Sequence, residues 1–132
     1  MTRAIRFEKV GGPEVLSLQE VSLRPPGDGE VRVRHTAIGV NFIDIYHRTG
    51  LYKVSLPSGL GLEAAGVVEI TGPNVSRFRT GDRIAYASGP IGAYSEAANV
   101  VADRAVKIPD GVSAEMAAAI LLKGLTAHYL LR

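Results

Sequence analysis

Residues 41–52, NFIDIYHRTGLY, hold the densest group of hydrogen-bonding and aromatic side chains in the chain. Three of the eight aromatic residues lie here, namely Phe42, Tyr46 and Tyr52. Asn41 carries an amide that both donates and accepts hydrogen bonds, which suits recognition of another amide. The tyrosines offer flat apolar faces, each with a phenol that donates hydrogen bonds. The segment therefore concentrates aromatic faces and hydrogen-bonding groups that could serve a binding or catalytic site.

Structural roles explain several of the same residues. Asn41 is a good N-cap residue for a helix that starts at position 42. Asp44 and Arg48 lie four residues apart, in the favourable order for an ion pair along a helix. Phe42 and Ile45 fall at helical spacing and are expected to pack into the core. From residue type alone, capping is the simpler role for Asn41.

The elements around this segment have the pattern of a β protein. Val31 and Val33 alternate with arginines, which predicts a half-buried strand that ends near Val40. A short helix of about two turns is expected from Asn41, and Gly50 should end it. Further short strands separated by turns are expected over residues 5–8, around Leu16 and Leu18, and over AAGVVEI (64–70), RIAYA (83–87), AYSEAANVV (93–101) and RAVKI (104–108). The pattern predicts a mainly β fold with short helices, as a small barrel or sandwich.

The last twenty residues have a different character. Ser113 should cap a helix over residues 115–122, and Gly124 is expected to interrupt it. A second helix is expected to begin near Thr126 and to leave its final leucines uncovered. This ending predicts that the chain stops at a domain boundary.

The composition is that of an ordinary globular protein, with 46% hydrophobic and 21% charged residues among 132. There are no cysteines, which removes disulfides and thiolate metal sites and fits a reducing compartment. The net charge is only +2, and RVR (32–34) and RFR (77–79) are read as the wet faces of strands rather than a phosphate-binding patch. No nucleic-acid partner, membrane insertion or secretory signal is expected. The expected location is the cytoplasm.

The remaining polar residues have simpler explanations. Glu63 lies in the apolar run LEAAGVV, so its carboxylate needs a partner. An arginine or a backbone donor is the expected partner, with catalysis as the alternative. Tyr86 and Tyr94 are read as core or barrel-face residues. The three histidines have no metal-ligand spacing and are read as surface or internally bonded residues, at positions His35, His47 and His128.

The order of several motifs resembles the zinc-independent quinone oxidoreductases of the medium-chain dehydrogenase/reductase superfamily. These motifs are GGPEVL (11–16), AIGVNFIDIYHRTGLY (37–52), LPSGLGLEAAGVVEITG (56–72), GDRIAYA (81–87), GAYSE (92–96) and AAAILLKGLTAHYLL (117–131). The resemblance implies that residues 1–122 form a GroES-like β-barrel catalytic domain. Residues 123–132 would begin the connection to an NADPH-binding Rossmann domain that is absent from these residues.

The same resemblance implies a site without metal. Asn41 stands where the related zinc alcohol dehydrogenases have a cysteine ligand, Leu62 where they have a histidine, and Ile43 where they have a proton-relay hydroxyl. Catalytic zinc needs three protein ligands and an open position. An amide and a leucine cannot replace a thiolate and an imidazole, so no metal is expected.

The family's functional positions map onto residues of this chain. Two tyrosines are implied as catalytic residues at the quinone, Tyr46 and Tyr52. The implied cofactor-binding residues are Asn41, Phe42, Ile43, Asp44, Ile45, Tyr46, Lys123, Thr126 and Tyr129. The expected reaction is hydride transfer from NADPH to a quinone or another small electrophile, in a homodimeric full-length protein.

Two other functions stay open from the residues alone. An NADPH-dependent alkenal or enone reductase would share the fold and the lack of zinc. A GroES-like binding module without catalysis is the second alternative, because no glycine-rich G-x-G-x-x-G turn opens a helix after a strand in these residues. For the same reason, residues 1–132 alone are expected to be inactive.

Overall fold

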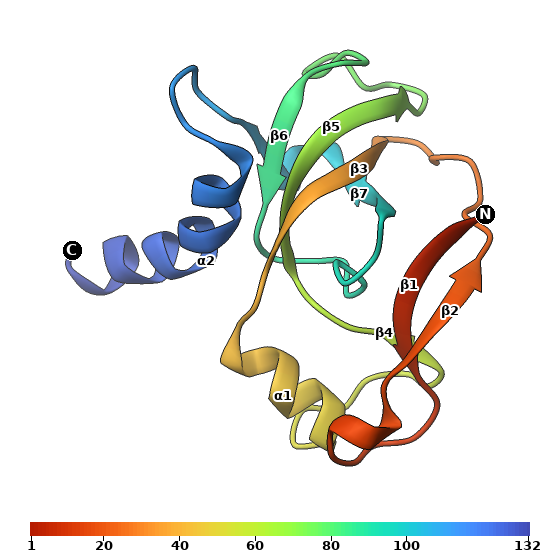
Figure 1. Cartoon of the computed structure of the whole chain (residues 1–132). Coiled ribbons are helices and arrows are strands. Elements are labelled where there is room, and N and C mark those ends of the chain that lie inside the picture. Colours follow the sequence, from red (N-terminus) through yellow and green to blue (C-terminus); the bar gives the residue numbers. More distant parts are fainter.

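The computed structural model describes all residues, 1–132, and the fold is mainly β, as predicted. The strands are β1 (Thr2–Phe7), β2 (Ser17–Val21), β3 (Glu30–Gly39), β4 (Ser58–Gly59), β5 (Glu63–Thr71), β6 (Arg83–Tyr86), β7 (Ala97–Val101) and β8 (Ala105–Lys107). The helices are α1 (Phe42–Thr49) and α2 (Ala114–Leu130), with short 3-10 turns η1 (Pro13–Val15) and η2 (Ala102–Arg104). Figure 1 shows their arrangement.

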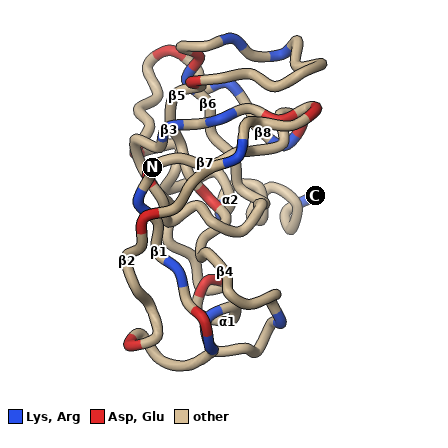
Figure 2. Tube along the Cα trace, turned by 90° about the vertical axis from the view of Figure 1, so that its right-hand side faces the viewer, with Lys and Arg blue, Asp and Glu red and all other residues tan.

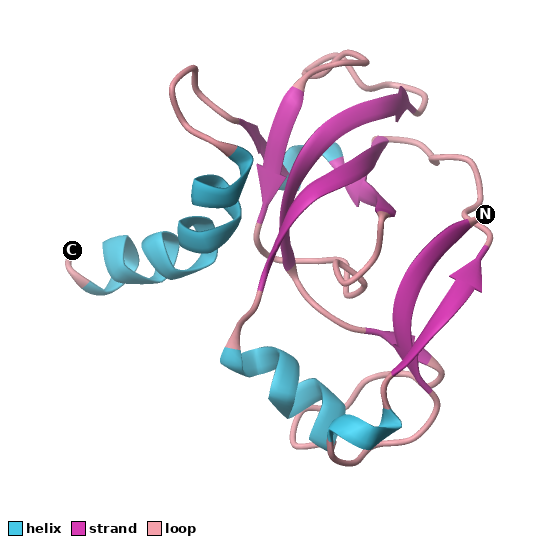
Figure 3. Cartoon of the chain, viewed as in Figure 1, coloured by secondary structure: helices cyan, strands magenta, loops and turns pink.

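The strands form two antiparallel sheets that face each other. One has the order β2-β1-β4 and the other β7-β3-β5-β6-β8. The segment before β7 joins them, because the N–H of Ile5 donates to the carbonyl of Tyr94 at 2.8 Å and the N–H of His35 donates to that of Glu96 at 2.9 Å. Figure 3 shows the strands curving around a common interior, with α1 across one end and α2 outside the larger sheet.

The alternation predicted for β3 is confirmed, because Val31 and Val33 are completely buried and Arg32 and Arg34 are not. The main core cluster is built by the larger sheet and its adjoining loops and consists of Val31, Val33, Ala64, Val68, Phe78, Ile84, Tyr86, Ala93, Val100, Ala102 and Ala105. A second cluster lies between α2 and the outer face of the larger sheet, with Ala65, Ala85, Ile108, Ala117 and Ala118. Small residues on both sides let α2 lie close to the sheet, which fixes the position of its later turns.

The helical prediction at the end of the chain was wrong in one respect. Ser113 is the N-cap, and its Oγ accepts the N–H of Met116 at 3.1 Å, as expected. However, α2 continues through Gly124 to Leu130 as one helix. Glycine costs only about 1 kcal/mol in a helix interior, and the alanines and leucines around it favour the helix. The strand predicted over 93–101 is also shorter and begins at Ala97.

Charged residues of both signs are interspersed along the chain, and Figure 2 shows no large area of one sign. Arg32 and Arg34 lie on β3 and contact Asn99 and Glu69, as expected for a strand face. RFR (77–79) lies in the loop between β5 and β6, so its assignment to a strand was wrong. This segment alternates between charged and apolar residues because Phe78 is buried and anchors the loop in the core. No helix of the structure is long and apolar enough to cross a membrane.

Candidate active site

The opening segment forms the helix predicted for it, between the end of β3 and an irregular stretch. Asn41 has an extended backbone at the N-cap, and Gly50 at the C-cap adopts a left-handed conformation with φ of 86°. Positive φ is easily reached only by glycine, so this residue sets where α1 ends. The predicted helix over Asn41 to Gly50 is confirmed.

The Asn41 side chain is engaged away from its helix. Asn41 and Asp44 stand in a capping-box arrangement, yet the Asn41 side chain makes no capping hydrogen bond. Asp44 serves the helix end instead, since its Oδ2 accepts the N–H of Asn41 at 3.0 Å. The Asn41 amide donates from Nδ2 to Glu63 Oε1 at 2.8 Å and accepts at Oδ1 from Lys123 Nζ at 3.0 Å. A role as helix cap therefore does not account for this side chain.

Glu63 is the buried centre of this group. Its side chain is 0% exposed, and Oε2 accepts the backbone N–H of Leu122, in the middle of α2, at 2.6 Å. Lys123 Nζ lies 4.0 Å from Oε1. The expected backbone donor is confirmed, whereas the charged partner is a lysine rather than an arginine. Gly39 permits this approach, because a Cβ there would lie 2.4 Å from both Glu63 Oε1 and the carbonyl oxygen of Ala118.

Asp44 makes a contact that the sequence did not predict. Tyr94 donates its hydroxyl to Asp44 Oδ2 at 2.7 Å. Burial, followed by this hydrogen bond, raises the pKa of Tyr94. The predicted ion pair of Asp44 with Arg48 is wrong, since no such pair forms and Asp44 Oδ1 and Arg48 Nε lack partners. The carboxylate is almost fully buried against the barrel, where the tyrosine reaches it from fifty residues away.

The aromatic residues of the segment lie together. The rings of Tyr46 and Tyr52 meet edge to face with centroids 5.4 Å apart, and Tyr52 also lies 6.2 Å from the ring of His47. Phe42 and Ile45 are 75% and 42% exposed, so their expected place in the core was wrong. They face outward because the buried side of α1 is taken by the polar residues Asp44 and His47. Ile43 is half-buried.

The predicted residues of α2 are only partly brought to this place. Lys123 joins the group through Asn41 and also donates to the carbonyl of Val40 at 3.3 Å. Thr126 donates its hydroxyl to the carbonyl of Leu122 within the helix at 3.0 Å. Tyr129 is 79% exposed and lies six residues beyond Lys123. The structure thus unites Asn41 and Lys123, pairs Tyr46 with Tyr52, and leaves Thr126 and Tyr129 on the exposed end of α2, outside this group.

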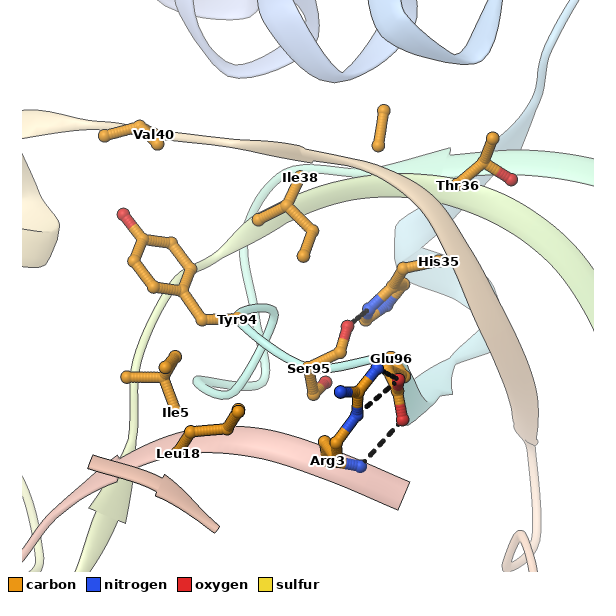
Figure 4. A pocket seen from close by; sticks show the side chains of 11 residues that line it. Arg3, Ile5, Leu18, His35, Thr36, Ile38, Val40, Tyr94, Ser95 and Glu96 are labelled. Carbon is orange, nitrogen blue, oxygen red and sulfur yellow. Dashed lines mark hydrogen bonds and ion pairs between the residues drawn. The ribbon is translucent and has the colours of Figure 1, made fainter. Parts of the chain in front are cut away.

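A wide pocket lies elsewhere, on the other side of β3 from α2 (Figure 4). It measures about 540 Å³ and is lined by Arg3, Ile5, Leu18, His35, Thr36, Ala37, Ile38, Val40, Tyr94, Ser95 and Glu96. His35 is already bonded on both sides, at 2.7 Å to the carbonyl of Ser95 and 2.9 Å to the hydroxyl of Tyr86. Burial lowers its pKa, which keeps the ring neutral. We therefore place the candidate site at Asn41, Glu63 and Lys123 rather than in this cavity.

Two interpretations from the sequence are confirmed at the edge of the site, and one residue was missed. His35 is internally bonded, and Tyr86 is a core residue. Tyr94 was read only as a barrel residue, although it holds Asp44 beneath Asn41. A tyrosine between an alanine and a serine in GAYSE (92–96) is a weak signal for such a contact. No three histidine, cysteine, aspartate or glutamate side chains gather as metal ligands do.

Comparisons with known proteins match the whole chain. The family profile "Alcohol dehydrogenase GroES-like domain" matches residues 27–110. The chain is 55% identical to a quinone oxidoreductase of Pseudomonas aeruginosa over 133 residues, which are 100% of this chain and 41% of the relative. It is 42% identical to a 2-haloacrylate reductase of a Burkholderia species, over 99% of this chain and 41% of that protein.

A solved structure agrees with these relatives. The crystal structure of Escherichia coli quinone oxidoreductase complexed with NADPH superposes with a TM-score of 0.97 at 51% identity, covering 98% of this chain and 40% of that one. The chain thus spans about two-fifths of the length of the relatives that it matches. Because the family profile covers well over half of its residues, the chain belongs to the family of alcohol dehydrogenase GroES-like domains.

Proposed function

We propose that the chain is the catalytic domain of a zinc-independent NADPH:quinone oxidoreductase, which transfers a hydride from NADPH to a quinone. Identities of 51–55% to quinone oxidoreductases along the whole chain support the activity. The crystal structure of one of these relatives with NADPH supports the cofactor. In this proposal residues 1–122 form the catalytic domain and residues 123–132 begin the connection to a Rossmann domain.

The observation that carries the proposal is the group of Asn41, Glu63 and Lys123 beside exposed apolar side chains of α1. After its internal bonds, the Asn41 amide retains one N–H, and Lys123 retains one N–H as well. Phe42 and Ile45 are exposed next to these donors. Hydrogen-bond donors at the edge of an apolar surface fit a nicotinamide ring with its carboxamide, so these residues would hold that end of the cofactor.

The other predicted cofactor contacts extend along both helices. Thr126 and Tyr129 present exposed side chains on α2, while Ile43 and Asp44 contribute through the first turn of α1. Tyr46 borders both this surface and Tyr52. NADPH, when bound, supplies the hydride. The residues of this chain would align the nicotinamide ring with the quinone ring, so that only one face of the nicotinamide meets the quinone.

The two tyrosines are proposed to form the wall of the quinone site. Their edge-to-face packing leaves Tyr52 about half exposed, so its ring can face a ligand while the ring of Tyr46 supports it. The Tyr52 hydroxyl makes no hydrogen bond within the protein and is free to donate to a quinone oxygen. A donor aimed at the oxygen on which negative charge develops lowers the barrier to the reaction.

The side-chain types at the site support catalysis without zinc. Asn41 is bonded to Glu63 and Lys123, and Leu62 offers no ligand atom. A quinone accepts a hydride easily because its reduction yields an aromatic ring. A cytoplasmic location, a homodimeric full-length protein and the absence of a nucleic-acid partner complete the proposal, the last from the small net charge of +2.

A second candidate is the reduction of an activated alkene, which the 42% identity to a 2-haloacrylate reductase favours. Both reactions use the same cofactor and differ in the acceptor. Quinones and haloacrylates or enones should therefore be compared as substrates of the complete gene product, with kcat/KM as the measure. Preference for quinones by tenfold or more supports the first proposal, and the opposite preference supports the second.

The matched control is residues 1–132 alone. They should oxidise no NADPH with either class of acceptor, because the glycine-rich turn that holds the pyrophosphate lies outside them. Failure of the complete gene product with every acceptor would leave the domain as a binding module and refute both enzymatic proposals.

A further inference from the structure

Glu63 receives hydrogen bonds from two different elements on its two carboxylate oxygens. Oε1 accepts from the Asn41 amide at 2.8 Å, and Oε2 accepts the backbone N–H of Leu122 at 2.6 Å. The side chain is fully buried, and a charge in such a place requires several partners. Lys123, one residue further along α2, supplies the opposite charge at 4.0 Å.

We propose that Glu63 is a positioning residue, which holds the Asn41 amide in one orientation and fixes α2 so that Lys123 lies beside it. The inference rests on the proposed function, since it concerns how Asn41 and Lys123 are presented to the cofactor. Glu63 itself is covered by these residues and does not reach the ligand. Its effect passes through Asn41.

The directions of the hydrogen bonds show why residue 63 must offer two acceptor oxygens. Both Asn41 Nδ2 and the Leu122 N–H are donors, so residue 63 must offer an acceptor on each side. Glutamine offers one acceptor and one donor. Any orientation of a glutamine at this position sets a donor against a donor, either at Asn41 or at Leu122. Turning the Asn41 amide over does not help, because Nδ2 would then face the ammonium of Lys123.

The same directions fix which atoms of Asn41 remain free. An amide can usually be turned over without a visible difference in shape, and its hydrogen-bond partners decide the orientation. Here an acceptor on one side and a donor on the other allow a single orientation. The second N–H of Asn41 is left to bond outside the group. Glu63 thus ensures that Asn41 presents a donor to a carbonyl oxygen of the ligand.

The hydrogen bond from the N–H of Leu122 to Glu63 connects α2 to β5. A side chain that accepts an N–H from the middle of a helix commonly bends it there. Figure 1 shows α2 changing direction part-way along its length. Lys123, the residue after Leu122, reaches both Asn41 and the carbonyl of Val40. Glu63 therefore ties the start of β5 to the middle of α2, next to the residue that reaches Asn41.

The test compares Glu63→Gln with Glu69→Gln in the isotope-labelled complete gene product. Glu69 lies on the same strand, pairs with Arg34 and takes no part in the site, which makes it a matched control. NMR follows the side-chain NH₂ signals of Asn41 and the amide proton of Leu122. Titration with NADPH gives the Kd. We expect Glu63→Gln to shift all these signals and to raise the Kd about tenfold, as expected when a hydrogen bond to the ligand is lost. Glu69→Gln should change neither.

Three results separate the inference from the proposed function. Unchanged NMR signals in Glu63→Gln would overturn the inference. An unchanged Kd for Glu63→Gln would also overturn it, provided that Asn41→Ala weakens NADPH binding. If Asn41→Ala leaves the Kd unchanged too, the proposed cofactor site is wrong.

A double variant keeps the test valid if Glu63→Gln does not fold. Combining Asn41→Asp with Glu63→Gln reverses the donor and acceptor of the hydrogen bond between the two side chains. It also moves the negative charge from residue 63 to residue 41. A glutamine at 63 can then accept from Leu122 and donate to the aspartate, which also pairs with Lys123. This variant should fold normally but bind NADPH about tenfold more weakly, because the outward N–H of Asn41 is gone. If the double variant does not fold either, the hydrogen bond between residues 41 and 63 is not what Glu63→Gln disrupts, and the positioning role is refuted. A folded double variant with normal affinity would instead refute the proposed cofactor site.

Discussion

Replacement of Asn41 by aspartate separates the two roles of this residue most clearly. Aspartate is as good an N-cap as asparagine, so a capping role predicts no loss of stability. The structure predicts a large loss. The Asn41 Nδ2 atom lies 2.8 Å from Glu63 Oε1, and an oxygen in its place would bring two carboxylates together in a buried site.

The size of the loss follows from the cost of protonating one of the two carboxylates. The loss of stability cannot exceed this cost, since one of the two carboxylates in the folded protein can take up a proton and remove the repulsion. It amounts to about 1.4 kcal/mol for each pH unit above a carboxyl's ordinary pKa near 4, which gives about 4 kcal/mol at pH 7 and about 1.4 kcal/mol at pH 5. Lys123, 57% exposed and screened by solvent, reduces it only modestly. We expect a loss of about 2–4 kcal/mol at pH 7.

The sign of the pH dependence makes the prediction specific. The folded variant holds a proton that the unfolded chain releases above pH 4, so its stability falls as the pH rises from 5 to 7. Urea unfolding of wild type and variant at both pH values measures this difference. Asn41→Ser is the control, because serine is a good N-cap without charge and should show no added pH dependence. Equal losses for Asn41→Asp at pH 5 and pH 7 would refute the buried contact with Glu63.

Three further predictions concern the tyrosine wall, the metal and the buried histidine. In the complete gene product, Tyr52→Phe should lower kcat/KM for quinones about 30-fold, which corresponds to about 2 kcal/mol, without changing the urea midpoint; unchanged kinetics would reduce Tyr52 to packing. Elemental analysis should find well under one zinc per chain, and stoichiometric zinc with loss of activity to chelators would contradict this. Burial lowers the pKa of His35 in the folded protein. As the pH falls below about 6.5, His35 is therefore protonated in the unfolded chain before it is protonated in the folded protein, and the free energy of unfolding decreases. His35→Gln should flatten that decline between pH 7.5 and 5 in urea titrations, relative to wild type, and an unaltered slope would show that His35 titrates normally.

Local patterns in the sequence were sufficient for several elements. The alternation in β3 and the polar start and glycine end of α1 depend on neighbouring residues, so both elements could be predicted. The continuity of α2 could not be predicted from Gly124, because packing of its first turns on the sheet overrides one unfavourable residue. RFR (77–79) has a strand's alternation, but its phenylalanine anchors a loop.

The polar contacts of the site depend on residues that are distant in sequence. Asp44 had a suitable partner four residues away in Arg48, yet Tyr94 competes for it across the barrel. Glu63 could be predicted to need a partner because a buried carboxylate cannot stay unpaired. That the partners are Asn41 and Lys123 follows only from the fold, which brings β5 and α2 to the start of α1.

Hydride transfer in the absence of metal is the central claim, and a single-turnover measurement tests it most directly. The complete gene product, treated with a chelator and freed of metal, is mixed with a quinone and with NADPH deuterated on one or the other face of its nicotinamide ring. Disappearance of NADPH is then followed over time. We predict reduction of one quinone per NADPH at the rate of the untreated protein, slowed by deuterium on one face only. A rate that collapses after chelation and returns with zinc, or no oxidation of NADPH by any quinone, would contradict the account.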